Sequence, residues 1–333
     1  MKIIIEKLLD QQDLAQKEAR DTMRKIMSGE YDNSQISGFL IAMRAKGEKS
    51  FEIAGFAEAM REKMTTISIS DDAIDMCGTG GDASGTFNVS TAASFVVAGA
   101  GVKVAKHGNR SMTSKSGSAD VLESLGVNIT LSPKKVTECI ETLGLGFMFA
   151  PALHPAMKHA MTARKSLAIR TVFNILGPLC NPANVKRQVM GIFDGGITEK
   201  IANVLKILGS QHAMIVHGDD GLDEISTTAD THYTELLPNG KIKSGIISPI
   251  NFNISTTDLK TLKGGDPDYN AKILQNILNG EKGPQRDIVV LNAAAGIKVG
   301  GRASSMEEGI KLAEEAIDSG LANNVLKSLI NIK

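Results

Sequence analysis

The first 70 residues show a hydrophobic pattern with the period of an α-helix. After a cap cluster at Asp32-Asn33-Ser34, apolar residues recur at i, i+3, i+4 and i+7 and stop at Gly47, and a second set follows Ser50. The two stripes consist of Ile36, Phe39, Leu40 and Met43, and of Ile53, Phe56, Met60 and Met64. Such stripes usually bury one face of a helix. The pattern therefore predicts a small all-helical unit over residues 1–70.

From Ile74 onward, short apolar runs alternate with helix-like segments. The runs expected to be strands are 74–77, 102–108, 147–150, 188–193, 213–218 and 287–296, and the helices lie at 89–101, 118–127, 154–174, 198–209, 270–279 and 305–319. Alternation of this kind indicates an α/β fold with a mostly parallel sheet flanked by helices. Ligands of such sheets bind at the loops that leave the carboxyl ends of the strands. Three polar loops meet that condition, at 77–91, 106–118 and 217–224.

Composition narrows the class of protein. Hydrophobic residues make up 42% and charged residues 22%, which is globular, and 37 basic residues balance 37 acidic ones. This balance, with 4% aromatic residues and no Trp, argues against binding to nucleic acid. No apolar run reaches the roughly 18 residues of a membrane span, and the start of the chain turns polar too soon for a secretory signal. The three cysteines form no CxxC pair, so a reducing cytoplasm is expected.

The first polar loop concentrates glycines between a predicted strand and a predicted helix. Gly78, Gly80, Gly81 and Gly85 fall within eight residues. Glycines allow backbone N–H groups to converge on an anion, and the helix N-terminus adds partial positive charge. An ordinary tight turn is the alternative. GTGGDA also fits the loose dinucleotide pattern, but Lys106 ends the next strand where NAD binding favours an acid, so a phosphate or phosphosugar loop is preferred.

The other two loops carry opposite charge. The second holds three cations among five hydroxyl residues, which suits a polyanionic ligand, although a solvated basic turn has the same composition. The third, HGDDGLDE, is acidic and would repel a phosphate unless a hard cation lay between them. Mg²⁺ is commonly held by one or two carboxylates together with phosphate oxygens. Taken with the first two loops, the acidic loop indicates a divalent ion rather than a plain surface turn.

Several strings in this order resemble the anthranilate phosphoribosyltransferase family: CGTGGD, TFNVST, KHGNR, SKSGSADVLESLG, FAPALHPAMK, RTVFNILGPLCNPA and HGDDGLDE. The resemblance covers the chain to about residue 300. It implies Mg²⁺-assisted transfer of the phosphoribosyl group of phosphoribosyl pyrophosphate to the amine of anthranilate, with release of pyrophosphate. It also implies a helical domain over 1–70, with a contribution from about 160–185, an α/β domain over 71–333, and a homodimer formed through the helical domain.

The resemblance also assigns residues, position by position. For phosphoribosyl pyrophosphate these are Gly78, Gly81, Asp82, Thr86, Asn88, Val89, Ser90, Thr91, Lys106, Ser114 and Ser118. For anthranilate they are Gly78, His107, Asn109, Arg164 and Pro178, and for magnesium Ser90, Asp223 and Glu224. Ala83 stands where the family usually has glycine, and Met112-Thr113 replaces smaller residues.

The reaction implied by the resemblance needs positioning and charge neutralisation rather than a strong general base, because an aromatic amine attacks in its neutral form. Two other functions stay open at this point. One is a pyrimidine-nucleoside phosphorylase, which would not need the acidic loop. The other is a non-catalytic sensor of a phosphosugar or nucleotide.

Overall fold

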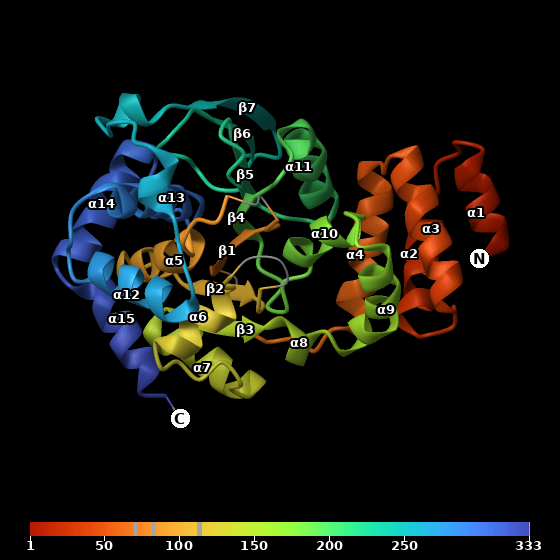
Figure 1. Cartoon of the computed structure of the whole chain (residues 1–333), viewed down its shortest axis with the longest axis horizontal. Coiled ribbons are helices and arrows are strands. Elements are labelled where there is room, and N and C mark those ends of the chain that lie inside the picture. The colour runs from red at the N-terminus through yellow and green to blue at the C-terminus, as the bar shows by residue number, and fades with distance from the viewer. Residues whose placement is uncertain (70–71, 82–83, 112–114, 333) are drawn as a thin grey trace.

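The computed structural model describes residues 1–69, 72–81, 84–111 and 115–332. The N-terminal part is a bundle of four helices: α1 (Lys2–Leu9), α2 (Gln16–Met27), α3 (Asn33–Lys46) and α4 (Ser50–Lys63). The two helices predicted from the apolar stripes are confirmed as α3 and α4. Asp32 caps α3, since its side chain accepts from the Gln35 N–H, and Gly47 ends the helix with φ +84°. The bundle lies at one end of the molecule (Figure 1).

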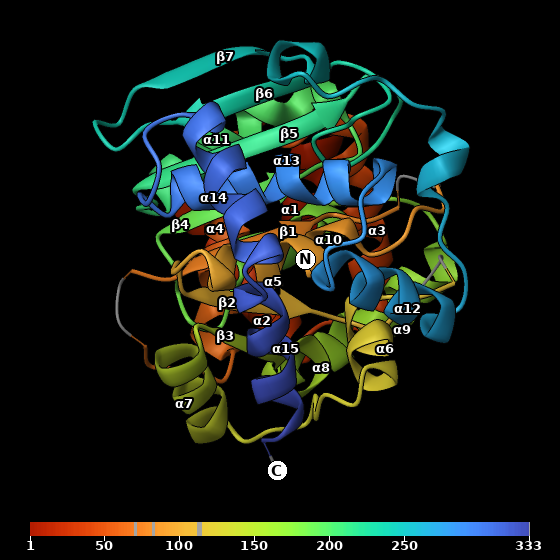
Figure 2. The ribbon, with the colours of Figure 1, turned by 90° about the vertical axis from the view of Figure 1, so that its left-hand side faces the viewer.

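The sheet has seven strands in the order β3-β2-β1-β4-β5-β6-β7. Their bounds are β1 (Ile74–Gly78), β2 (Val104–Gly108), β3 (Leu145–Phe149), β4 (Arg187–Gly191), β5 (His212–Gly218), β6 (Thr231–Leu236) and β7 (Ile242–Ile247). The first five run parallel and match five predicted strands. Strand β6 runs antiparallel to both β5 and β7, and neither β6 nor β7 was predicted. The mostly parallel sheet is thus confirmed, and Figure 2 shows its strands in this order from β7 to β3.

Helices cover both faces of the sheet. The longer ones in this part of the chain are α5 (Val89–Gly99), α6 (Ser118–Ser124), α7 (Pro133–Leu143), α11 (Thr198–Ile207), α12 (Pro267–Leu278), α13 (Pro284–Val299), α14 (Met306–Asp318) and α15 (Leu321–Ile330). Strand β5 shows the two covered faces, since Met214 belongs to the hydrophobic core with α5 and α13, whereas Ile215 belongs to the core shared by α11 and the N-terminal bundle. In Figure 2, α5, α13, α14 and α15 lie in front of the sheet.

Short elements link the sheet to the bundle. They are α8 (Ala150–Leu153), η1 (Pro155–Met157), α9 (Lys158–Leu167), α10 (Phe173–Leu176) and η2 (Gly177–Leu179). Elsewhere in the chain, η3 (Gly195–Ile197) follows β4, and η4 (Pro249–Phe252) and η5 (Leu259–Leu262) follow β7. The expectation of one helix over 154–174 is therefore wrong. Ala168 ends α9 in a left-handed conformation, with φ +49°, and residues 168–172 separate α9 from α10.

The expectation of a strand over 287–296 is also wrong, because this run forms the middle of α13. Pro284 occupies the first turn of the helix, where its missing N–H is tolerated. The helix is buried on nearly all sides and has no polar face. A continuous apolar run of this kind is equally compatible with a buried strand. In the described parts of the chain, no helix combines the length and apolar character needed to cross a membrane.

Candidate active site

The site lies where the order of the strands reverses. From β1 the chain continues to β2 and β3 on one side of the sheet and then crosses to the other side of β1 to form β4 and β5. Strands β1 and β4 are therefore neighbours, and Gly78 pairs with Gly191 at their carboxyl ends. This is the switch point at which open α/β sheets bind ligands. The glycine-rich loop leaves β1 at this point, and the acidic loop leaves β5, with β4 between them. This strand order explains why the first and third polar loops lie close together at the carboxyl ends of the strands, as predicted.

Asp223 brings the acidic loop against the glycine-rich loop. The backbone N–H of Gly80 donates to Asp223 Oδ2 over 2.7 Å. A Cβ on Gly78 would lie 2.5 Å from the same oxygen, and a Cβ on Gly191 would overlap the Asp223 backbone. Both strand ends therefore need glycine so that the buried Asp223 can fit between them.

Glu224 reaches the N-terminus of α5. Its Oε1 accepts from the backbone N–H of Ser90 over 3.1 Å, where a helix has donors without intrahelical partners. The Nζ of Lys106 donates to the Met76 carbonyl over 2.6 Å and lies 3.5 Å from Ser90 Oγ. Burial lowers the pKa of Lys106, and the nearby Asp75 carboxylate opposes that change. The structure thus gathers Ser90, Lys106 and Glu224 around one helix end.

The remaining residues of the first loop differ in which of their groups are available to contact a ligand. Asn88 holds the loop in place, because its amide donates to the Ser116 carbonyl and its carbonyl oxygen accepts from Asn270. Thr86 lies within 3.2 Å of Ser84, hydroxyl to hydroxyl. The Val89 side chain belongs to the hydrophobic core, which leaves only its backbone for a ligand. Thr91 Oγ1 is buried without a hydrogen-bond partner in the described structure, which marks it as a free polar group beside the helix end.

The second loop is only partly available to a polyanion. Arg110 is engaged with Asp120 and Glu123 of α6, so this cation serves the loop's own structure. Ser118 Oγ donates to the Asn109 carbonyl over 3.3 Å, and the Asn109 side chain accepts from the Arg110 N–H. The predicted residues Asp82 and Ser114, together with Ala83, Met112 and Thr113, lie outside the described residues.

A pair of histidines lies beside this loop. The rings of His107 and His154 are 5.0 Å apart, centroid to centroid, and the Nε2 of each is buried with no partner in the described structure. Burial lowers the pKa of His107 to about 3, with further lowering by His154 and Lys106, and burial lowers the pKa of His154 to about 4. Both rings are therefore neutral at physiological pH, and each leaves one ring nitrogen for a ligand.

Arg164 is a largely buried cation. Its guanidinium lies 5.2 Å from the centre of the Phe173 ring, and burial lowers its pKa. Within the described residues it has no ion-pair or hydrogen-bond partner. Pro178 in η2 is half-buried, and its carbonyl accepts from Gln188 over 3.0 Å. No recorded contact in this part of the structure joins Arg164, Asn109 and Pro178, so their meeting at one ligand stays a prediction.

Three residues near the site were missed by sequence reasoning. Asp75 is fully buried in β1, where an acid within an apolar run was the only available signal. Asn181 donates to Asp75 Oδ2 over 2.8 Å and to the Ala105 carbonyl over 2.9 Å. Arg170 donates to the Gly81 carbonyl. These contacts join segments that lie between 76 and 106 residues apart in the sequence, so no local pattern indicates them.

A metal ion would find oxygen ligands here, but not a complete set. Within the described residues, no three His, Cys, Asp or Glu side chains converge as metal ligands. Asp223, Glu224 and the Ser90 hydroxyl are hard oxygen donors around the end of α5. That donor set fits Mg²⁺, which usually takes its remaining ligands from water and substrate phosphate.

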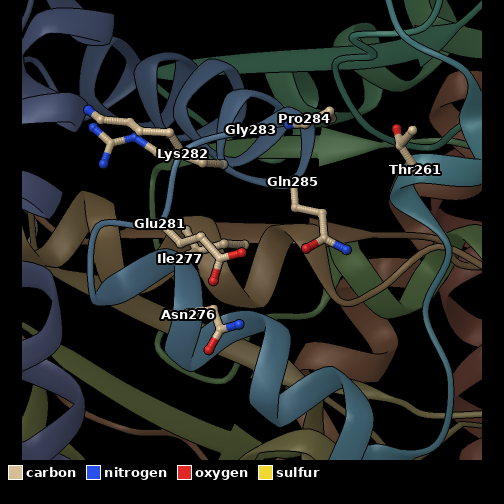
Figure 3. Close-up of a pocket in the computed structure, with 9 residues that line it drawn as sticks. Thr261, Asn276, Ile277, Glu281, Lys282, Gly283, Pro284 and Gln285 are labelled. Carbon is tan, nitrogen blue, oxygen red and sulfur yellow. The ribbon is translucent and has the colours of Figure 1, made fainter.

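A separate cavity lies away from these residues. It has a volume of about 130 Å³ near the start of α13 and is lined by Thr261, Asn276, Ile277, Glu281, Lys282, Gly283, Pro284, Gln285 and Arg286 (Figure 3). Its lining includes none of the predicted site residues. The cavity is therefore no part of the candidate site.

Comparisons with known proteins place the whole chain in a family. The a/b domain of a glycosyl transferase family matches residues 70–323, and the helical bundle domain of such a family matches residues 2–64. An anthranilate phosphoribosyltransferase of Alkaliphilus metalliredigens is 53% identical over 333 residues, which is 100% of this chain and 98% of the relative. The crystal structure of anthranilate phosphoribosyltransferase from Thermus thermophilus has a TM-score of 0.93 at 40% identity and covers 98% of each chain. The enzyme from Saccharomyces cerevisiae in complex with PRPP and Mg has a TM-score of 0.91 at 30% identity, covering 99% of this chain and 96% of its own.

Proposed function

This chain belongs to the anthranilate phosphoribosyltransferase family, and from that premise we propose that its strand-end site transfers the phosphoribosyl group of phosphoribosyl pyrophosphate to the amine of anthranilate. The enzyme class is that of glycosyltransferases, and the products are N-(5-phosphoribosyl)anthranilate and pyrophosphate. The observation that carries the proposal is the contact of Asp223 with Gly80 beside the N-terminus of α5. This contact puts anion-binding amides and cation-binding carboxylates at one point.

The diphosphate of the donor would bind to main-chain amides of the glycine-rich loop and the first turn of α5. Helix N-termini bind anions through free N–H groups and the helix dipole. Lys106 adds a charge that is almost fully removed from solvent, and such a charge is screened little by salt. Gly78, Gly81, Thr86, Asn88, Val89, Ser90, Thr91 and Ser118 supply the remaining contacts in this proposal, with Asp82 and Ser114.

Ser90, Asp223 and Glu224 would hold Mg²⁺, and a bound Mg²⁺ neutralises charge on a pyrophosphate leaving group. Glu224 accepts from Ser90 N–H in this structure, so the carboxylate and the hydroxyl already lie at the same helix end. The carboxylate of Asp223 is fixed by the Gly80 N–H in a position between two strand ends. These residues therefore act by holding charge in place rather than by moving protons.

The acceptor would bind on the side of the second loop. Arg164 is a desolvated guanidinium without an ion-pair or hydrogen-bond partner in the described structure, which suits bidentate binding of the anthranilate carboxylate. His107 is neutral because burial lowers its pKa to about 3, so it adds no positive charge beside an attacking amine. Asn109, Gly78 and Pro178 complete the acceptor contacts that we propose.

We extend the proposal to assembly and location. In this proposal the boundary between the helical domain and the α/β domain lies at 70/71, and residues 160–185 contribute to the helical domain. Two copies of the chain form a homodimer through their helical domains. Exposed apolar residues of α1 and α3 favour such an interface, since Ile3 is 79%, Leu9 64% and Ile41 48% exposed. The three free cysteines favour the cytoplasm.

Anthranilate fluorescence tests the proposal. The expected result is a loss of anthranilate fluorescence that requires both phosphoribosyl pyrophosphate and Mg²⁺, with pyrophosphate released in equal amount. Unchanged fluorescence with folded protein and saturating Mg²⁺ would refute it. Uridine with inorganic phosphate serves as the contrasting substrate pair and should give no free base.

A further inference from the structure

Arg170 lies on the step between α9 and α10, and its side chain contacts the glycine-rich loop. The guanidinium donates to the Gly81 carbonyl, and its Cζ lies over the Phe193 ring, 4.1 Å from the ring centre. Phe193 itself is tied to the same loop, because its N–H donates to Thr79 Oγ1 over 3.1 Å. The Arg170 side chain is thus held between the loop after β1 and the turn after β4.

The backbone of Arg170 contacts the helical bundle. The guanidinium of Arg44, in the last turn of α3, donates to the Arg170 carbonyl. The side chain of one residue therefore binds the proposed substrate loop while its backbone is bound by the N-terminal bundle. Among the described contacts, this is a direct polar connection between α3 and the residue that holds Gly81.

The segment around Arg170 has a defined conformation. Ala168 has φ +49°, and the Thr171 N–H donates to Asn174 Oδ1 over 2.9 Å. Gly80, which directly precedes Gly81, is held by Asp223. Two adjacent residues of the loop are therefore hydrogen-bonded to groups from different segments: Gly80 to Asp223 of the sheet domain, and Gly81 to Arg170 between α9 and α10.

We propose that Arg170 is a positioning residue that holds the glycine-rich loop in its anion-binding conformation and couples it to the helical bundle through Arg44. A loop that is held before binding loses less conformational freedom when an anion arrives. Removing the guanidinium should therefore weaken binding of the diphosphate donor more than it slows the transfer step. This inference rests on the proposed function for the identity of the donor.

A binding measurement tests the proposal without turnover. The chain contains no tryptophan, so Phe193→Trp introduces a single indole under the Arg170 guanidinium. In that background, Mg²⁺ and phosphoribosyl pyrophosphate are titrated without anthranilate, and Arg170→Met should raise the dissociation constant about tenfold, as expected for one lost charge-assisted hydrogen bond. Arg170→Lys should recover part of the affinity. Lys165→Met is the matched control, since Lys165 is an exposed cation of α9.

Isothermal titration of the same Arg170 variants with natural Phe193 repeats the measurement free of any effect of the indole. An unchanged dissociation constant in Arg170→Met, or an equal effect of Lys165→Met, overturns the proposal. If the donor binds and Arg170 matters, but anthranilate is never modified, the proposed function fails while this inference stands.

A double-substitution cycle tests the coupling to the bundle. Arg44→Met alone should raise the KM for phosphoribosyl pyrophosphate, with kcat and the KM for anthranilate changed less than about twofold. In the Arg170→Met background the same substitution should have little further effect, because its influence passes through residue 170. Fully additive effects would contradict the coupling.

Discussion

Asn181 donates to the buried carboxylate of Asp75 where strands β1 and β2 part. The register pairs Ile74 with Val104, and beyond that pair the described strands are bridged by side chains. Asn181 binds both Asp75 and the Ala105 carbonyl, and Asp75 accepts from the His107 N–H over 3.3 Å. The Asn181 amide, from the segment after η2, thus bridges the two strands whose loops form the candidate site.

Replacing Asn181 should reveal this role in stability. Asn181→Ala leaves the Asp75 carboxylate, the Ala105 carbonyl and the Ala183 N–H without the Asn181 partner in a buried place. Each such group costs about 1–3 kcal/mol, so we expect a loss of at least about 2 kcal/mol in the free energy of unfolding. Urea denaturation measures it, with Asn323→Ala, which removes only an exposed hydrogen bond to Asn279, as the control. Equal midpoints for the two variants would contradict the bridging role.

The two acids of the third loop should matter for turnover and not for folding. Asp223→Asn and Glu224→Gln keep the side-chain shape but remove the charge proposed to hold Mg²⁺. We expect kcat/KM to fall roughly 100-fold or more, because a bound metal contributes several kcal/mol to charge stabilisation. Rates measured across a Mg²⁺ series check this.

Asp219→Asn is the matched control for the acids, since Asp219 lies in the same loop but is about half exposed and paired with His232. It should change the rate by less than about twofold. Loss of activity in all three variants alike would point to loop folding instead of metal binding.

Arg164 should select the acceptor by its carboxylate. Arg164→Ala should raise the KM for anthranilate about 10- to 100-fold while the KM for phosphoribosyl pyrophosphate stays nearly unchanged, since a hydrogen bond to a charged group is worth about 1.5–3 kcal/mol. Kinetics with anthranilate and with aniline, which lacks the carboxylate, measure the preference. If the variant still discriminates fully between the two amines, Arg164 does not bind the carboxylate.

The buried histidines predict a dependence of stability on pH. Burial lowers the pKa of His107 from 6.5 to about 3 and that of His154 from 6.5 to about 4, so below pH 6.5 the unfolded chain binds more protons than the folded one. Stability is therefore fully present above pH 6.5 and declines as the pH falls toward these values, by at most about 1.4 kcal/mol per pH unit for each ring.

Denaturation of the natural chain and of His107→Gln at about pH 7, 6 and 5 tests this dependence, a range that lies between the folded and unfolded pKa values. The variant should lose less stability across this range than the natural chain. His232→Asn, which removes an exposed ring, is the control. Parallel stability profiles for the natural chain and His107→Gln would contradict the prediction.

Local patterns were sufficient for part of this fold. The strand that ends at Gly78 and the helix after Asn88 were predicted because a change of hydrophobic period is visible within a few residues. The run in α13 was misassigned because a helix buried on all sides and a buried strand give the same continuous apolar letters. Strand β6 was missed because its buried Glu235 is hydrogen-bonded to His212 and ion-paired with Lys298, partners that the local sequence does not reveal.

The candidate site divides in the same way. Gly80, Asp223 and Glu224 were found because glycine clusters and acidic clusters are local features. Asp75, Asn181 and Arg170 act through contacts between distant segments, and their side chains carry no local signature of that role. Residue types therefore indicate the chemistry of this site, whereas its supporting contacts depend on the fold.

The antiparallel direction of β6 has a practical consequence. Strand β5 ends at the carboxyl ends of the parallel strands, where the proposed substrate loops lie. Strand β6 runs in the opposite direction, so the connection from β6 to β7 lies at the amino ends of the parallel strands. That connection is a tight turn, with Pro238 and Asn239 exposed and Gly240 at φ +77°. A fluorescent label, an epitope or a surface tether attached to this turn is separated from the proposed substrate loops by the full length of a strand. The turn is therefore a suitable site for immobilising the enzyme without blocking substrate access.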